Sequence, residues 1–158
     1  MIAAGGGPEE VRVKFAMRMG MTVRLWKATT DQLAKAAGYE GCSLIPLYHL
    51  AMTPAGLTQV ELSRRMNISE SSVVRILRPL LDRQLVSRTR MIGDGRARLI
   101  KLEARGADAI EAFEPRAAAL RARLLDGISE GDIELATSIL TIVTERLSEF
   151  GEAELSPD

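Results

Sequence analysis

The segment from Leu57 to Leu102 limits most strongly what this chain can fold into. Thr58-Gln59-Val60-Glu61 is a capping box, in which the threonine hydroxyl accepts from the glutamate amide while the glutamate reaches back. Asn67, a residue that tolerates left-handed backbone geometry, ends the helix that this box begins. Ser69 then caps a further helix, which we expect to run to about Gln84. The pattern predicts two short helices joined by a tight turn.

A hairpin is predicted directly after these helices. Short strands are expected over residues 86–91 and 96–102, with the turn signal Asp94-Gly95 between them. The spacing of Ser63, Asn67 and Val73 supplies the small, turn-permissive and buried branched residues that a helix-turn-helix requires. We therefore predict a mainly α protein with a small β-hairpin wing, that is, a winged helix-turn-helix.

The positive charge of the chain is concentrated in the same segment. Residues 60–105 contain eleven Lys and Arg and five Asp and Glu, a net charge of +6, although the whole chain is neutral. Arginines kept only for solubility would not explain why five of them and a lysine lie in or beside one hairpin. Duplex DNA does explain it, because the phosphates beside a narrow minor groove attract a basic wing. Arg64, Arg65, Arg78 and Arg83 fit phosphate contacts and ordinary solvation equally well.

The beginning of the second helix and the wing tip are the expected reading elements. Arg75 is the best candidate for reading guanine, because its fork matches the O6/N7 pair in the major groove. At the tip, Asp94 is expected to orient Arg96 into the minor groove; alternatively, Asp94 only makes the turn and Arg96 is only solvated. The predicted DNA-binding residues are Ser69, Ser71, Ser72, Arg75, Arg78, Arg88, Arg90, Asp94, Arg96 and Arg98.

The flanking segments are predicted to be long helices. Residues 11–25 alternate between apolar and polar, but a fifteen-residue strand would be unusually long, so we expect one helix over 9–37 that ends at Gly38. A shorter helix is expected over 43–52. After Gly106 we expect a helix to Leu125, which Pro115 kinks or breaks in two. Ser129 caps the last helix, whose apolar stripe is Ile133, Ala136, Leu140, Val143 and Leu147.

Composition excludes several classes of function. A single cysteine, Cys42, and a single histidine, His49, leave no intrachain disulfide and no Cys/His zinc cluster. We find no nucleophile motif and no phosphate-cradling glycine loop, so neither an enzyme nor a cofactor or metal site is expected. The first ten residues lack the basic and apolar pattern of a secretory signal, and no apolar run reaches the roughly 20 residues that span a bilayer. The expected location is the cytoplasm.

The chain resembles the MarR family of bacterial transcriptional regulators from about Arg24 to Leu147. The resemblance is strongest over LTQVELSRRMNISESSVVRIL, QLVSRTR and DGRARLIKLEARG. It implies that Ser71 and Arg75 touch bases and that Arg96 is the minor-groove arginine. It also implies an obligate homodimer with interlocking terminal helices. Pro79 and Glu103 depart from the family pattern, where a polar helix former and a capping threonine are usual.

The resemblance gives each segment an expected role. Residues 1–8 are a flexible N-terminus, 9–37 and 107–150 dimerisation helices, 42–106 the winged helix-turn-helix DNA-binding domain, and 151–158 an acidic tail. The expected function is a DNA-binding regulator, a repressor, that acts as a homodimer on a pseudo-palindromic operator. Its half-sites would lie about one helical turn apart, roughly 10 bp.

Effector binding is the least defined part of the expected function. The resemblance implies a small phenolic or aromatic-acid anion that releases DNA, and Arg18, Trp26, Tyr48 and His49 are candidates because such a ligand needs a stacking surface and a cation or donor. Aromatic residues such as Trp26 and Tyr48 are, however, more often part of a core than of a pocket. A redox-sensing regulator that uses Cys42 is one alternative. A winged-helix module that binds protein or RNA is another.

Overall fold

We describe residues 7–91 and 94–154 of a computed structural model of the chain. Within these ranges the chain forms six helices and three strands: α1 (Pro8–Ala36), α2 (Ile45–Ala51), β1 (Leu57–Thr58), α3 (Gln59–Met66), α4 (Glu70–Asp82), β2 (Val86–Met91), β3 (Asp94–Leu102), α5 (Ala104–Leu124) and α6 (Glu130–Glu154). The expectations for the extreme N-terminal residues and for the end of the acidic tail lie outside these ranges. The mainly α fold with a hairpin wing is confirmed.

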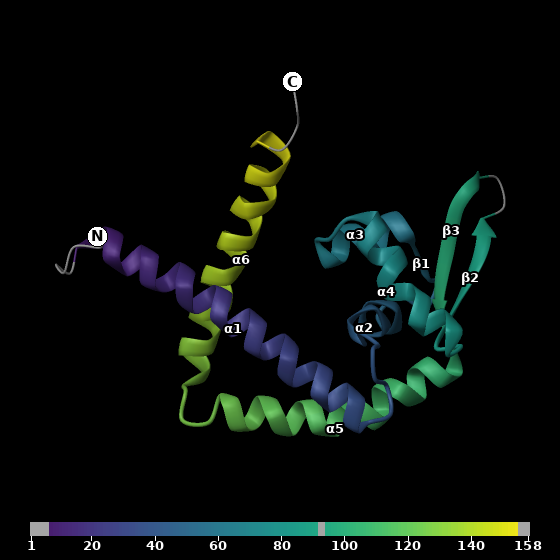
Figure 1. Cartoon of the computed structure of the whole chain (residues 1–158), viewed down its shortest axis with the longest axis horizontal. Coiled ribbons are helices and arrows are strands. Elements are labelled where there is room, and N and C mark those ends of the chain that lie inside the picture. The colour runs from purple at the N-terminus through teal and green to yellow at the C-terminus, as the bar shows by residue number, and fades with distance from the viewer. Residues whose placement is uncertain (1–6, 92–93, 155–158) are drawn as a thin grey trace.

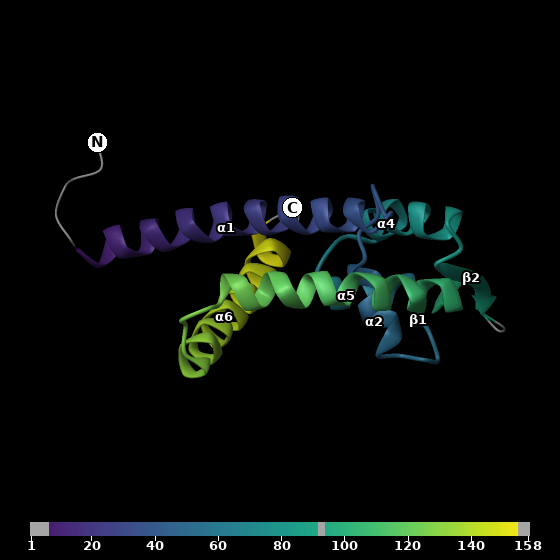
Figure 2. The same cartoon turned by 90° about the horizontal axis from the view of Figure 1, so that it is seen from below.

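The elements separate into a compact unit and a set of long helices. Figure 1 shows α2, α3, α4 and the sheet gathered together, with most of α1 and α6 outside this group. α6 meets the compact unit where Asn67 Nδ2 donates to the Ser148 hydroxyl at 3.0 Å. In Figure 2, α1 and α5 run side by side, and these two helices are in contact. Since α5 also contacts α2, it joins the compact unit to the long helices.

The two helices of the compact unit begin and end where the sequence predicts. The Thr58 hydroxyl accepts from the Glu61 amide at 3.1 Å, and the Glu61 carboxylate accepts from the Thr58 amide at 2.7 Å, so the capping box is confirmed. Asn67 ends α3 in the left-handed conformation, at φ 50°. The Ser69 hydroxyl accepts from the Ser72 amide and starts α4. The tight turn therefore fixes the angle at which α4 leaves α3.

The core of the compact unit is aliphatic, as the scarcity of aromatic residues requires. Its fully buried side chains come from α2, α3, α4 and β3: Leu47, Leu50, Leu62, Val73, Leu77, Leu80 and Ile100. Ser63 is buried beside them, and its hydroxyl donates to the Val60 carbonyl, so the small residue at the helix crossing brings no unsatisfied polar group. This core holds α4 rigidly against the wing.

The sheet contains a strand that the sequence does not predict. Its order is β1-β3-β2, all antiparallel, and β1 pairs Leu57 with Ile100 and Thr58 with Leu99. A two-residue strand is too short to produce an alternating pattern. It ties the start of α3 to the wing, and the wing therefore moves with the helix pair rather than independently.

The structure corrects the predicted extent of two helices and shows the setting of a third. α5 begins at Ala104 and continues through Pro115 as one helix. Of the two predicted effects of Pro115, a kink or a break, the break is therefore wrong; proline removes one hydrogen bond, and the flanking turns maintain the helix. The helix α2 is shorter than the predicted 43–52. The predicted stripe of α6 is mostly exposed in the single chain, including Leu140 and Leu147. None of the helices in the described ranges is both long and apolar enough to cross a membrane.

Candidate nucleic-acid interface

The first turn of α4 brings four of the predicted DNA-binding residues together. The Ser69 hydroxyl lies 3.0 Å from that of Ser71 and donates to that of Ser72 at 2.9 Å. Arg75 donates from its Nη2 to the Ser72 hydroxyl at 3.4 Å. The hydroxyls and one guanidinium thus form a polar cluster at a helix N-terminus, a position that also offers backbone N–H groups and a favourable dipole to an anion.

The exposed residues of α4 form one continuous stripe along the helix. Glu70, Ser71, Val74, Arg75, Arg78 and Asp82 are exposed and recur at helical spacing, whereas Val73, Leu77 and Leu80 face the core. The stripe therefore contains three predicted residues together with Glu70, Val74 and Asp82, which the sequence analysis did not select. Because Val73 and Val74 are adjacent and both apolar, the sequence does not show which of them is buried. Only the orientation of α4 in the fold shows that Val74 is the exposed one.

The strand register puts three predicted arginines on one face of the wing. Arg90 pairs directly with Arg98, and Arg88 pairs with Ile100 in the adjacent position on that face. Because Ile100 is fully buried, this is the face that packs toward α4, and the arginines continue it beyond the core. Like charges at directly opposite positions repel one another. This face of the wing therefore presents three guanidinium groups in a row.

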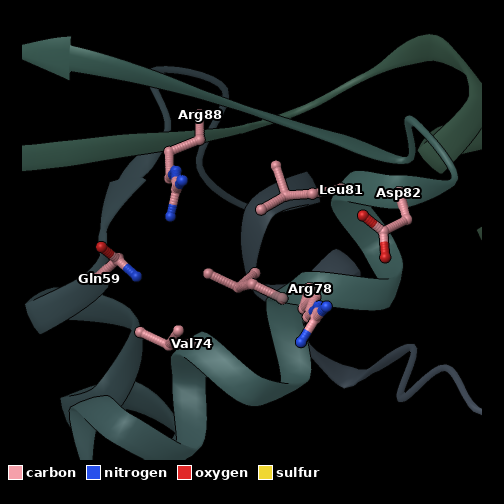
Figure 3. A pocket seen from close by; sticks show the side chains of 7 residues that line it. Gln59, Val74, Arg78, Leu81, Asp82 and Arg88 are labelled. Atoms are coloured by element: carbon pink, nitrogen blue, oxygen red, sulfur yellow. The ribbon is translucent and has the colours of Figure 1, made fainter.

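A cavity of about 480 Å³ lies between the stripe and the wing, and opens to solvent. Figure 3 shows Gln59 and Arg88 on one side, from the first turn of α3 and from β2, and Val74, Arg78, Leu81 and Asp82 on the side formed by α4. Two guanidinium groups and one carboxylate line it, so its walls carry net positive charge. The stripe of α4 and the arginine face of the wing are therefore parts of one surface.

The predicted wing-tip pair cannot be tested in the same way. β3 begins at Asp94 rather than at residue 96, so the prediction that Asp94-Gly95 forms the turn is wrong. Asp94 and Arg96 both lie in the strand, and the backbone of Asp94 pairs with Met91. Their side chains lie outside the described residues, so the expected salt bridge and groove contact stay predictions.

Several arginines of the basic segment have structural partners. Arg83 donates to the carbonyl oxygens of Gly38 at 2.7 Å and Glu40 at 3.1 Å, and so fastens the loop after α1 to the end of α4. Arg65 donates to the Thr53 hydroxyl at 2.8 Å. Neither partner was foreseen, because the residues concerned lie 12 to 45 positions apart in sequence. The net charge of the segment thus overstates the charge available to a polyanion.

Tyr48, a predicted effector-binding residue, is held within the chain. Its hydroxyl donates to Glu114 Oε2 of α5 at 2.6 Å, and Glu114 also pairs with Arg121. Partial burial and this hydrogen bond raise the pKa of Tyr48 to about 12. The hydrogen bonds from Tyr48 and Arg121 hold the pKa of the Glu114 carboxyl below its usual value. Tyr48 therefore links α2 to α5, whichever ligand the protein binds.

The other predicted effector residues are distributed over two helices. Arg18 and Trp26 lie two turns apart on α1, where both are exposed. His49 is half-buried on α2, and partial burial together with the nearby Arg65 guanidinium lowers its pKa, which favours the neutral ring. The cavity described above is lined by none of these four residues.

Cys42 lies in a setting unlike that of a reactive thiol. Its side chain is 4% exposed and packs in the aliphatic core. Burial raises the pKa of the thiol, and Arg83, which acts in the opposite direction, has the smaller effect. A redox-active cysteine needs a lowered pKa and access to oxidant, so this environment disfavours the redox alternative.

These features define a winged helix-turn-helix protein in which a basic wing lies beside an exposed recognition helix. The model of the MarR family matches residues 47–97, from α2 to the beginning of β3. Among solved structures, the transcriptional regulator PA3341 is 27% identical over 85% of this chain and 98% of its own, with a TM-score of 0.70. In this segment, and in the fold that surrounds it, the chain is similar to the MarR family.

More distant solved structures share the fold over almost the full length of the chain. A MarR protein from Peptoclostridium difficile has a TM-score of 0.78 at 13% identity, covering 94% of this chain and 93% of that one. The MepR–DNA complex from S. aureus has a TM-score of 0.73 at 23% identity, covering 84% and 97%. The fold of this chain is that of MarR-family transcriptional regulators.

Proposed function

We propose that this protein is a sequence-specific DNA-binding transcriptional regulator, a repressor, that acts as a homodimer. The observation that carries the proposal is the single surface formed by the stripe of α4 and the arginine face of the wing. A recognition helix of this size fits the major groove, and an adjacent hairpin then reaches the sugar–phosphate backbone and the minor groove. The solved complex of MepR with DNA, a protein of the same fold, supports the same partner here.

Within this surface we assign different tasks to different residues. Ser71 and Arg75 are proposed to read base edges, with the polar cluster at the start of α4 fixing the helix on the phosphates through Ser69 and Ser72. Arg78, Arg88, Arg90 and Arg98 are proposed as contacts to the phosphates, and Arg96, with Asp94, as the contact to the minor groove. Arg65 and Arg83, which donate to Thr53 and to the carbonyls of Gly38 and Glu40, are left out of the set.

The homodimer is supported by apolar surface on the long helices. A monomer rarely exposes so many large apolar side chains on neighbouring elements. On α1 and α6 the exposed ones are Val11, Phe15, Met17, Met21, Val23, Leu25, Trp26, Leu135, Ile139, Leu140, Ile142, Leu147 and Phe150. We propose that a second copy covers both helices, which also accounts for the apolar residues on several sides of α1. The operator is then a pseudo-palindrome with half-sites about 10 bp apart.

We also propose that a small aromatic or carboxylate ligand regulates DNA binding. The half-exposed Trp26 offers a stacking surface, and the neutral imidazole of His49 offers a hydrogen-bond donor and acceptor. Screening phenolic and carboxylate compounds for a raised melting temperature and for release of DNA tests this part of the proposal. Ligands found in this way should lose their effect in a Trp26→Ala variant.

The central experiment is selection of preferred sites from random duplex DNA, followed by affinity measurements at several salt concentrations. We expect a pseudo-palindromic site, a steep fall of affinity with salt, and loss of sequence preference in Arg75→Ala. Arg78→Lys serves as a matched control that keeps the charge and should keep the preference. Equal affinity for duplex DNA and single-stranded RNA, or a single unrepeated half-site, would contradict the proposal.

A further inference from the structure

Val74 is the apolar exception in the exposed stripe of α4. Its side chain is 48% exposed, whereas that of the adjacent Val73 is 1% exposed. The core under α4 is already filled by Val73 and Leu77, so packing inside the compact unit does not explain an apolar residue at position 74. An isolated exposed valine is common on protein surfaces. Its neighbours make this one informative.

Three neighbours of Val74 on the stripe are residues to which the proposed function assigns DNA contacts, while Glu70, one turn before it, is a carboxylate without such a role. Ser71 precedes it by one helical turn, Arg75 follows it directly, and Arg78 lies one turn further on the same stripe. In Figure 3 the Val74 side chain forms the lower wall of the cavity, with Gln59 close by and Arg88 above. Val74 thus lines the same cavity as Arg78 and Arg88, the two residues to which the proposed function assigns phosphate contacts.

The chemistry of the major groove offers one apolar partner for such a side chain. Of the groups that the four base pairs present there, only the C5-methyl of thymine is apolar, and small apolar side chains recognise it by contact. Valine suits this task because its branched side chain has a strongly preferred rotamer in a helix, so little conformational entropy is lost on contact. Its two methyl groups present a fixed apolar surface to the groove.

We propose that Val74 determines sequence specificity by contacting the C5-methyl group of one thymine in each half-site. The inference deepens the proposed function and rests on it. Val74 would recognise thymine by an apolar contact, in addition to the hydrogen bonds to base edges that are assigned to Ser71 and Arg75. Arg78 and Arg88 act as positioning residues, because phosphate contacts on either side of the cavity hold the register that brings this methyl onto Val74.

Replacing thymine by uracil tests the proposal, because uracil lacks only the methyl group and pairs in the same way. The duplex is the preferred site selected by the wild-type protein, and each thymine is replaced in turn. At one position per half-site, replacing thymine by uracil should lower the affinity of the wild-type protein about fourfold. This is the effect expected from the burial of one methyl-sized group. The Val74→Ala variant should bind the thymine and uracil forms of that position equally well.

Two controls separate this effect from damage to the protein. Val74→Ala should keep the melting temperature, the affinity for unrelated DNA and the salt dependence of the wild type, because the side chain is exposed and uncharged. Val60→Ala changes another exposed valine, on α3, and should keep every thymine-to-uracil penalty of the wild type.

The outcomes distinguish this inference from the proposed function. If a preferred site is found but no thymine-to-uracil penalty disappears in Val74→Ala, Val74 does not read a methyl group and the inference is overturned, while the regulator stands. If the wild type selects no preferred site from random DNA, the proposed function fails first, and the inference falls with it.

Discussion

Tyr48 of α2 donates a hydrogen bond of 2.6 Å to Glu114 of α5, and this bond joins two residues 66 positions apart. It connects the compact unit to the helix that runs along α1. Because the proposed DNA-binding surface is in the compact unit and the proposed dimer surface is on the long helices, the hydrogen bond lies where the two are connected.

Removing this hydrogen bond should loosen the junction between the two parts. Tyr48→Phe should lower the free energy of unfolding by about 1 kcal/mol, the usual net value of one side-chain hydrogen bond. The measurement is urea unfolding at neutral pH. Glu114→Gln, which can still accept, is the milder comparison and should cost less. An unchanged midpoint in Tyr48→Phe would mean that the bond does not persist in solution.

The same hydrogen bond makes a prediction about pH. The pKa of Tyr48 is raised from about 10 to about 12, so its contribution to stability is complete below pH 10 and is lost as the pH rises toward 12. The pKa of Glu114 is lowered, so its contribution is present above the usual glutamate range and is lost as the pH falls through its lowered value. The wild type should lose its advantage over Tyr48→Phe at both extremes, as unfolding curves at a series of pH values would reveal.

Arg83 and Arg78 should respond to mutation in opposite ways. Arg83→Ala removes the donor to the Gly38 and Glu40 carbonyls and should cost about 1 kcal/mol of stability, allowing for the exposure of the guanidinium, with an unchanged salt slope of DNA binding. Arg78→Ala should keep the melting temperature and lower the salt slope by about one for each phosphate that a protomer no longer neutralises. Thermal unfolding and salt titrations of DNA affinity distinguish the two roles. If Arg83→Ala reduces the salt slope of DNA binding, Arg83 contacts DNA phosphates and belongs to the DNA-binding surface.

Sequence reasoning located the elements of the compact unit because their signals are local. The capping box at Thr58, the left-handed turn at Asn67 and the cap at Ser69 each depend on residues within three or four positions of one another, and each is found in the structure. The two wing strands were also predicted from a local signal, although the Asp94-Gly95 pair that was expected to form the turn lies in β3. Ser69, Ser71, Ser72 and Arg75 lie within two turns of one helix start, so their proximity also follows from the local sequence.

What the sequence could not reveal depends on contacts between distant positions. The hydrogen bonds from Arg83 to its carbonyl partners and from Tyr48 to Glu114 join residues 43 to 66 positions apart. No local sequence pattern predicts contacts over such separations. β1 was missed because two residues make no pattern. The exposure of Val74 was not predicted because, next to the apolar Val73, it is indistinguishable from a core residue until the orientation of the helix is known.

Close packing around Gly106 leaves no room for a side chain at this position. In sequence it marks the start of a helix, but α5 begins at Ala104 and Gly106 lies inside its first turn. A Cβ added there would overlap the Leu85 carbonyl oxygen and lie 2.7 Å from Leu102 Cδ1. Gly106→Ala should therefore destabilise the fold by about 1–3 kcal/mol, because backbone must shift to admit the methyl group. Gly131→Ala, in the first turn of α6 with no atom near the added carbon, should have no such penalty, and calorimetric unfolding compares the two.

Cys42 should be slow to react in the folded protein, since its thiol is buried and its pKa is raised. We expect a disulfide reagent to modify it at least about tenfold more slowly in buffer than in denaturant, because the thiolate is the reacting form and the core excludes the reagent. Mild peroxide treatment should leave DNA affinity unchanged. Cys42→Ser, which keeps the size but puts a hydroxyl in the core, is the control for the assignment of the label. If peroxide releases DNA from the wild type and not from Cys42→Ser, the core opens often enough for the thiol to act as a sensor.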